Sequence, residues 1–69
     1  MNDWYERESH WWTLVDENNF ALGRVRHFPS GWRLQWRASR LDFFQEKWWA
    51  DTELEEAKAW GLAMIRMHQ

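Results

Sequence analysis

The residues of this 69-residue chain that could carry out acid–base or metal chemistry are three histidines and a short run of acids. His10, His27 and His68 are scattered and show no metal-ligand spacing. The acids at 53–56 fall in the first turn of an expected helix, where the helix dipole accounts for them. The sequence has no cysteine and no phosphate-binding glycine loop. We therefore predict no catalytic residue, no metal ligand and no cofactor, and a protein that is not an enzyme.

Arginine and tryptophan are the residues whose number and placement indicate a function. The segment from Asn18 to Leu41 contains no acid and five arginines: Arg24, Arg26, Arg33, Arg37 and Arg40. The acids lie in the first seventeen residues and from Asp42 onward, and the formal net charge of the whole chain is −2. The chain also has eight tryptophans. Tryptophan and arginine are the residues most enriched among the anchors of binding interfaces. This composition favours binding over catalysis.

The C-terminal segment 52–68 has the period of an amphipathic helix. Thr52 is suited to cap it, and Glu55, three residues later, would complete a capping box. At 100° per residue the apolar stripe comprises Leu54, Ala57, Gly61, Met64, Ile65 and His68, flanked by Trp60 and Met67. A glycine inside a helix costs about 1 kcal/mol relative to alanine. We therefore expect Gly61 to allow close approach of a bulky residue from the rest of the chain.

The remainder of the chain predicts short antiparallel strands. Segment 10–16 is rich in β-branched and aromatic residues, and segment 20–28 is a second strand interrupted by Gly23. Pro29-Ser30-Gly31 predicts a turn. Segment 32–38 is a half-buried strand, because Trp32, Leu34, Trp36 and Ala38 alternate with Arg33, Gln35 and Arg37. Segment 40–49 could be a fourth strand or a helix capped by Ser39, and its paired aromatics favour the strand. We expect an α+β fold: a three- to four-stranded antiparallel meander with one C-terminal helix packed on one face. Residues 1–69 form one domain, with an arm at 1–9, strands within 10–49 and the helix at 52–68.

The register of the hairpin around Pro29 decides where the arginines lie. A loop of two or four residues pairs Gly23 or Val25 with Trp36 and gathers Arg24, Arg26, Arg33 and Arg37 on the outer face. A loop of three residues would instead set Arg24 and Arg26 beside the tryptophans. We favour the first register, because it leaves the charges in water.

Two tryptophan pairs, Trp11-Trp12 and Trp48-Trp49, present a geometric problem. Neighbouring side chains of a strand point to opposite faces, so one member of each pair must face away from the helix. Phe20 or Phe28, and Phe43 or Phe44, could enlarge the resulting patch. The N-terminal arm, a second copy of the chain, or a different macromolecule could cover it. We predict a partner-binding site comprising Trp12, Trp48, Arg24, Arg26, Arg33 and Arg37.

A protein is the leading partner, because tryptophan and arginine alternate along the same strands. A homodimer is one alternative, and a single-stranded nucleic acid is another. Proteins that bind single strands contact the phosphates with guanidinium groups and stack the bases on aromatic rings. No small-molecule substrate is evident. No apolar run approaches the ~20 residues that span a bilayer, and the start lacks the layout of a signal peptide. We expect a cytoplasmic protein with no membrane partner.

The run from Trp49 to Trp60 (WADTELEEAKAW), with Gly31-Trp32-Arg33 before it, resembles the layout of many small phage or prophage proteins. In these proteins a GW-containing strand precedes a helix of the T-x-E-E-A-K type on a small sheet. The resemblance covers the last two-thirds of the chain and carries over no functional residues. It implies a stoichiometric inhibitor that blocks a host enzyme or defence complex in the bacterial cytoplasm. Anti-CRISPR proteins are one such group.

Overall fold

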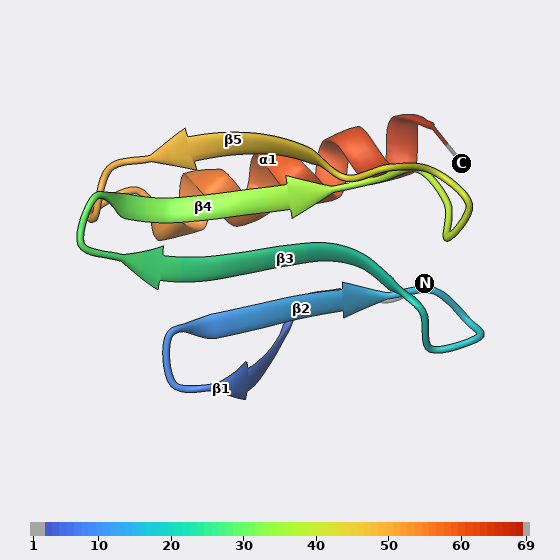
Figure 1. Cartoon of the computed structure of the whole chain (residues 1–69), viewed down its shortest axis with the longest axis horizontal. Helices are drawn as coiled ribbons and strands as arrows, with labels where there is room; N and C mark the ends of the chain where they lie inside the picture. The colour runs from blue at the N-terminus through green and yellow to red at the C-terminus, as the bar shows by residue number, and fades with distance from the viewer. Residues whose placement is uncertain (1–2, 69) are drawn as a thin grey trace.

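The computed structural model describes residues 3–68 and has one sheet with one helix against it (Figure 1). Its elements are, in order, β1 (Tyr5–Glu8), β2 (Trp11–Val15), β3 (Ala21–Phe28), β4 (Gly31–Trp36), β5 (Gln45–Trp49) and α1 (Leu54–Met67). Every strand pairs antiparallel with the next, so the spatial order is β1-β2-β3-β4-β5. The predicted α+β meander with one C-terminal helix is confirmed.

The sheet has five strands rather than the expected three or four. The additional strand, β1, lies within the segment predicted to be an arm, and all four of its residues are exposed. It has no apolar alternation, so pairing with the free edge of β2 supplies the reason for its extended form. The ambiguous segment 40–49 contains β5, so the strand is confirmed over the helix there. Residues 37–44 form the loop that leads into it.

Helix α1 lies behind β4 and β5 in Figure 1 and covers one face of the sheet, which we call the inner face. Its Ala57, Gly61 and Ile65 are buried, as the apolar stripe predicts. The sheet contributes the remaining buried hydrophobic residues: Leu14, Leu22, Val25, Trp32, Leu34 and Trp36. The core is thus a single layer between helix and sheet.

The expected role of Gly61 is confirmed by its neighbours. A Cβ atom at this position would lie 2.9 Å from Leu34 Cδ1 and 3.1 Å from Trp4 Cζ2. A Cβ atom at Gly23, on β3, would lie 2.6 Å from Trp4 Cη2. The two glycines therefore make room for the indole of Trp4, which reaches between helix and sheet. Its Nε1 donates a hydrogen bond to the Lys58 carbonyl oxygen at 2.8 Å.

Gly61→Ala tests this fit. Alanine gains about 1 kcal/mol in helix propensity, but overpacking a filled core costs about 1–3 kcal/mol. We expect a net loss of about 1 kcal/mol in the free energy of unfolding, measured by urea denaturation. The exposed helix position Ala63, replaced by glycine, calibrates the propensity term. A gain at Gly61 equal to the loss at Ala63 would contradict the fit.

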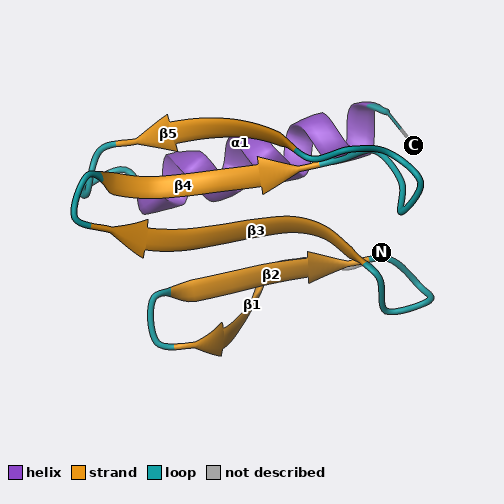
Figure 2. Cartoon of the chain, viewed as in Figure 1, coloured by secondary structure: helices purple, strands orange, loops and turns teal. Residues whose placement is uncertain are grey.

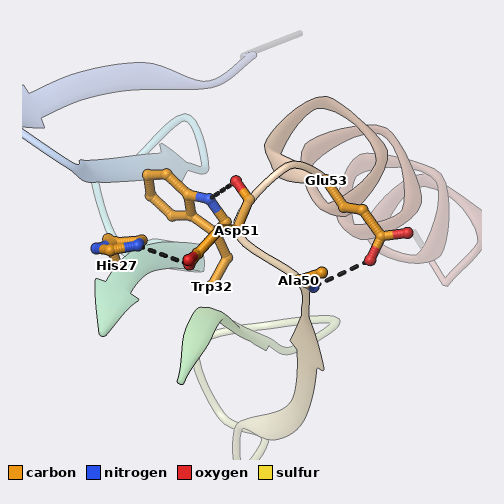
Figure 3. A network of polar contacts seen from close by, with 5 residues as sticks. All are labelled: His27, Trp32, Ala50, Asp51 and Glu53. Carbon is orange, nitrogen blue, oxygen red and sulfur yellow. Dashed lines mark hydrogen bonds and ion pairs between the residues drawn. The ribbon is translucent and has the colours of Figure 1, made fainter. Parts of the chain in front are cut away.

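The helix begins at Leu54, and the predicted capping box is wrong. Thr52 lies in the preceding turn, and the N-cap residue is Glu53, whose side chain accepts a hydrogen bond from Ala50 N at 3.0 Å. Asp51 holds this turn in place (Figure 3): its carbonyl accepts from Trp32 Nε1 at 2.9 Å, and its carboxylate lies 2.8 Å from His27 Nε2. Contacts with β3 and β4 thus fix where the helix starts, in place of a local cap.

Candidate functional site: an arginine-rich sheet face

The hairpin between β3 and β4 places the arginines on the face opposite the helix. Phe28 pairs with Gly31 across a two-residue loop, Arg26 with Arg33, and Gly23 with Trp36. This is the favoured register. Because paired residues share a face, Arg24, Arg26 and Arg33 point away from the core. No helix or loop of the described chain crosses this side of the strands, which faces the viewer in Figure 2.

The two tryptophan pairs divide between the faces, as strand geometry requires. Trp11 pairs with Arg26 and Trp48 with Arg33, so both lie on the outer face. Trp12 and Trp49 pack against the hydrophobic core on the inner face. The sequence-based prediction that Trp12 belongs to the binding site is therefore corrected: Trp12 lies on the inner face. Its ring lies beneath Lys58, whose Nζ is 3.6 Å from the ring centroid.

The N-terminal arm does not cover the outer face. Trp4 contacts Gly23 and Gly61 on the helix side, and β1 extends the sheet at its edge. Trp4 thus holds the start of the arm on the helix side, whereas Arg7, farther along in β1, reaches Trp11 at the edge of the outer face.

Arginines and aromatic rings alternate across the outer face in a continuous series. The Cζ atoms of Arg7 and Arg26 lie 5.1 and 4.6 Å from the centroid of the Trp11 ring. Arg26 and Arg33 lie 5.7 and 4.7 Å from the centroid of Phe28. Such cation–π contacts stabilise by about 0.5–1 kcal/mol each at exposed sites. They hold the guanidinium groups in defined positions over strands that are themselves rigidly paired.

A second cluster forms where the β4–β5 loop returns to the sheet. The ring of Phe44 has Arg24 Cζ at 4.2 Å and Arg37 Cζ at 4.3 Å from its centroid. Arg37 also donates from Nε to the Ala21 carbonyl at 2.9 Å and from Nη1 to the Arg40 carbonyl at 3.2 Å. Its side chain is therefore fixed by two backbone oxygens. Phe43, which precedes Phe44 in the loop, is 95% exposed.

These arginines carry charge that the protein does not neutralise by direct pairing. Within residues 3–68 the ion pairs are His27–Asp51 and Lys58–Glu55, and neither includes an arginine. Burial lowers the pKa of Arg24, and the charges of Arg37 and Arg33 lower it further. Glu46, which pairs with Gln35 on this face, accepts a hydrogen bond from Trp48 Nε1 at 3.0 Å.

Unpartnered polar atoms concentrate on the same face. Of the covered side-chain nitrogen and oxygen atoms that lack a hydrogen-bond partner in the described chain, four lie here and one, Trp49 Nε1, on the inner face. The four are Trp11 Nε1, Thr13 Oγ1, Arg24 Nε and Arg33 Nε. Buried polar groups are usually hydrogen-bonded, so such a concentration marks a surface whose polar requirements the chain alone does not meet.

We call the surface that combines these features the arginine face; its members are Arg7, Trp11, Arg24, Arg26, Phe28, Arg33, Arg37, Phe44 and Trp48. It brings together five of the six predicted site residues, all except Trp12. Trp48 is 44% exposed, and its ring meets Phe28 edge-on at 5.6 Å between centroids. Arg7 was missed because nothing in its sequence context indicates a strand. The sequence did contain a signal for Trp11. It lies three residues before Leu14 in the same strand, so the two side chains point to opposite faces, and Leu14 belongs to the core.

The histidines do not join this surface. His27 pairs with Asp51 at the start of the helix, and the His10 ring lies 5.7 Å from the His27 ring. His68 is exposed rather than part of the buried stripe, and its Nδ1 lies 2.9 Å from the Met64 carbonyl oxygen. Across residues 3–68, no group of three or more histidine, aspartate and glutamate side chains is arranged to hold a metal ion.

The comparisons with known proteins found no relative from which a function could be inferred. No family model, no curated protein and no solved structure matches the chain. Residues 3–68 contain no helix that is both long and apolar enough to cross a bilayer.

Proposed function

We propose that the protein is a non-enzymatic binding module whose arginine face docks on an acidic surface of another protein. The observation that carries this proposal is the set of guanidinium groups stacked on aromatic rings with no carboxylate paired to them. An acidic partner would supply the missing counter-charges, and Trp48 with the ring edges would supply apolar contact. In the setting that the phage resemblance implies, such a module acts as a stoichiometric inhibitor of a host or defence complex in the bacterial cytoplasm.

The contacts on this face favour a protein over the alternatives. A single-stranded nucleic acid stacks its bases on open ring faces, but the chain's own guanidiniums lie over Trp11, Phe28 and Phe44. A second copy docked face to face would oppose arginines with arginines, and like charges across an interface cost several kcal/mol. Neither objection applies to an acidic protein surface.

Charge reversal tests the proposal. Arg26 is exposed and central to the face, so Arg26→Glu places a carboxylate where the partner's acids would lie. We expect its affinity for a short polyglutamate peptide, used as a probe of acidic surfaces, to fall by about tenfold or more. The matched control is Arg66→Glu, an equal change of net charge at an exposed position in the last turn of the helix. It should alter the affinity by less than about twofold.

Two results would contradict the proposal. An equal loss in both variants would show that binding depends on net charge and not on the arginine face. Tighter binding of single-stranded oligothymidylate than of polyglutamate at the same salt concentration, with a steep salt dependence between about 50 and 200 mM, would favour nucleic acid instead. Cross-linking from Trp48 to partners in host extract, compared between wild type and Arg26→Glu, then identifies the protein bound.

A further inference from the structure

Three arginines of the arginine face, Arg24, Arg33 and Arg37, are neighbours in the sheet. Arg24 pairs with Gln35, and Arg33 lies two residues from Gln35 on the same strand face, so Arg24 and Arg33 are diagonal neighbours. Arg37 shares the ring of Phe44 with Arg24, each at little more than 4 Å from its centroid. The effect of Arg37 and Arg33 on the pKa of Arg24 follows from the same proximity. Three positive charges thus lie in one region of the arginine face, beside the β4–β5 loop.

The protein fixes these guanidiniums before any ligand arrives. Two backbone carbonyls hold Arg37, the Phe44 ring holds Arg24, and the Phe28 ring lies 4.7 Å from Arg33 Cζ. A guanidinium that stacks on a ring uses its flat face, which leaves the N–H groups along its edge for in-plane hydrogen bonds. On Arg37, Nε and Nη1 already donate to backbone carbonyls, so Nη2 is the nitrogen left for a ligand. These edges match the oxygen pairs of carboxylates and phosphates. Fixing them in advance lowers the entropy lost on binding.

The cluster is unfavourable without an anion. Like charges gathered at one place repel, and the Nε groups of Arg24 and Arg33 are covered and have no acceptor in the described chain. The covered Thr13 Oγ1, across from Arg24 in the sheet, also has no partner. A carboxylate brings one negative charge to three cations, whereas a phosphate monoester brings nearly two, with three acceptor oxygens.

We propose that Arg24, Arg33 and Arg37 form a site for a doubly charged tetrahedral oxyanion, the phosphate monoester of a phosphorylated side chain on the partner. This inference rests on the proposed function, because it names the group on the acidic partner that the arginine face binds most tightly. Arginine clusters recognise phosphorylated segments through bidentate hydrogen bonds of this kind.

The first test uses inorganic phosphate and acetate at equal ionic strength and slightly alkaline pH. We expect phosphate to shift the NMR signals of the Arg24 and Arg33 Nε–H groups in a saturable way, with an affinity about tenfold or more above that of acetate. Arg33→Gln should abolish saturation, whereas Arg66→Gln should leave it unchanged. Arg33→Lys keeps the charge but loses the planar edge, so a specific site predicts an affinity loss of about tenfold there as well.

The second test asks where the phosphate comes from. A phosphoserine peptide flanked by glutamates is compared with the same peptide carrying glutamate at the phosphorylated position. Binding about tenfold tighter for the phosphopeptide supports a phosphorylated partner; a phosphopeptide no tighter than inorganic phosphate assigns the site to the free ion. Equal shifts with phosphate and acetate, or oligothymidylate binding more tightly than the phosphopeptide, would overturn the site. If polyglutamate binding still depends on Arg26 in that case, the proposed function stands without it.

Discussion

Alanine in place of Gly31 is expected to destabilise the protein by about 3 kcal/mol or more, the largest single effect that the structure predicts. Gly31 has φ +124°, a conformation that L-residues rarely adopt, and such backbone strain costs about 1–3 kcal/mol. A Cβ atom there would also overlap the Trp49 carbonyl oxygen on the neighbouring strand. Neither backbone can yield without disturbing the β4–β5 pairing. For a domain of this size the whole free energy of unfolding is only about 3–10 kcal/mol.

The measurement is urea unfolding followed by far-UV circular dichroism, which reports the sheet and helix together. Ser30→Ala is the control, because Ser30 is exposed in the same turn and makes no comparable contact; it should change the free energy of unfolding by less than about 0.5 kcal/mol. If Gly31→Ala does not fold at all, the expected direction is met. A variant within about 0.5 kcal/mol of wild type would show that the hairpin can shift to admit a side chain.

Local pattern identified the parts of this fold in which each residue has a simple preference. Alternation of Trp32, Leu34 and Trp36 with Arg33 and Gln35 predicted β4 and both of its faces. The turn Pro29-Ser30-Gly31 left loops of two, three and four residues open. The preference for charges in water then selected the register that carries the arginines to the outer face. Because side-chain direction has a period of two in a strand, one correct register positions several site residues together.

The parts that sequence reasoning missed depend on contacts between distant segments. Strand β1 is exposed throughout and has no apolar alternation, and it is extended because β2 offers it a free edge. The helix begins after Thr52 because Asp51 is held by Trp32 and His27, which a local capping rule does not consider. In each case a contact from elsewhere in the chain overrides a local preference.

The member of each tryptophan pair that faces outward is decided by the same logic. Trp12 shares its face with Leu14, an aliphatic residue that the core requires, so Trp11 is left to face the arginines. On β5, Trp49 pairs with the buried Trp32 and so lies on the face that the helix covers, whereas Trp48 pairs with Arg33 and faces outward. On β2, the aliphatic residue two positions away is thus a better guide to the inner tryptophan than the tryptophan itself; on β5 the inner tryptophan is the one that pairs with Trp32.

Trp4→Ala is the second change with a large expected effect, and it tests whether the start of the chain is part of the core. The Trp4 indole fills the space between Gly23 and Gly61, and its hydrogen bond to Lys58 ties that filling to the helix. Truncating a packed tryptophan costs about 3–5 kcal/mol, and this half-buried ring should fall near the lower end. We expect a loss of about 3 kcal/mol, measured by urea unfolding.

The matched control is Trp48→Ala, which removes the same side chain from the arginine face, where it is 44% exposed. It should cost less than about 1 kcal/mol, because less of its surface leaves water on folding. Trp4→Phe separates the two contributions: the ring keeps most of the packing and loses the donor, so the loss should shrink to about 1 kcal/mol. Equal losses for Trp4→Ala and Trp48→Ala would contradict this account. Such a result would show that the Trp4 indole adds no more stability in the space between Gly23 and Gly61 than Trp48 adds on the surface. The glycines at these two positions would then need another explanation.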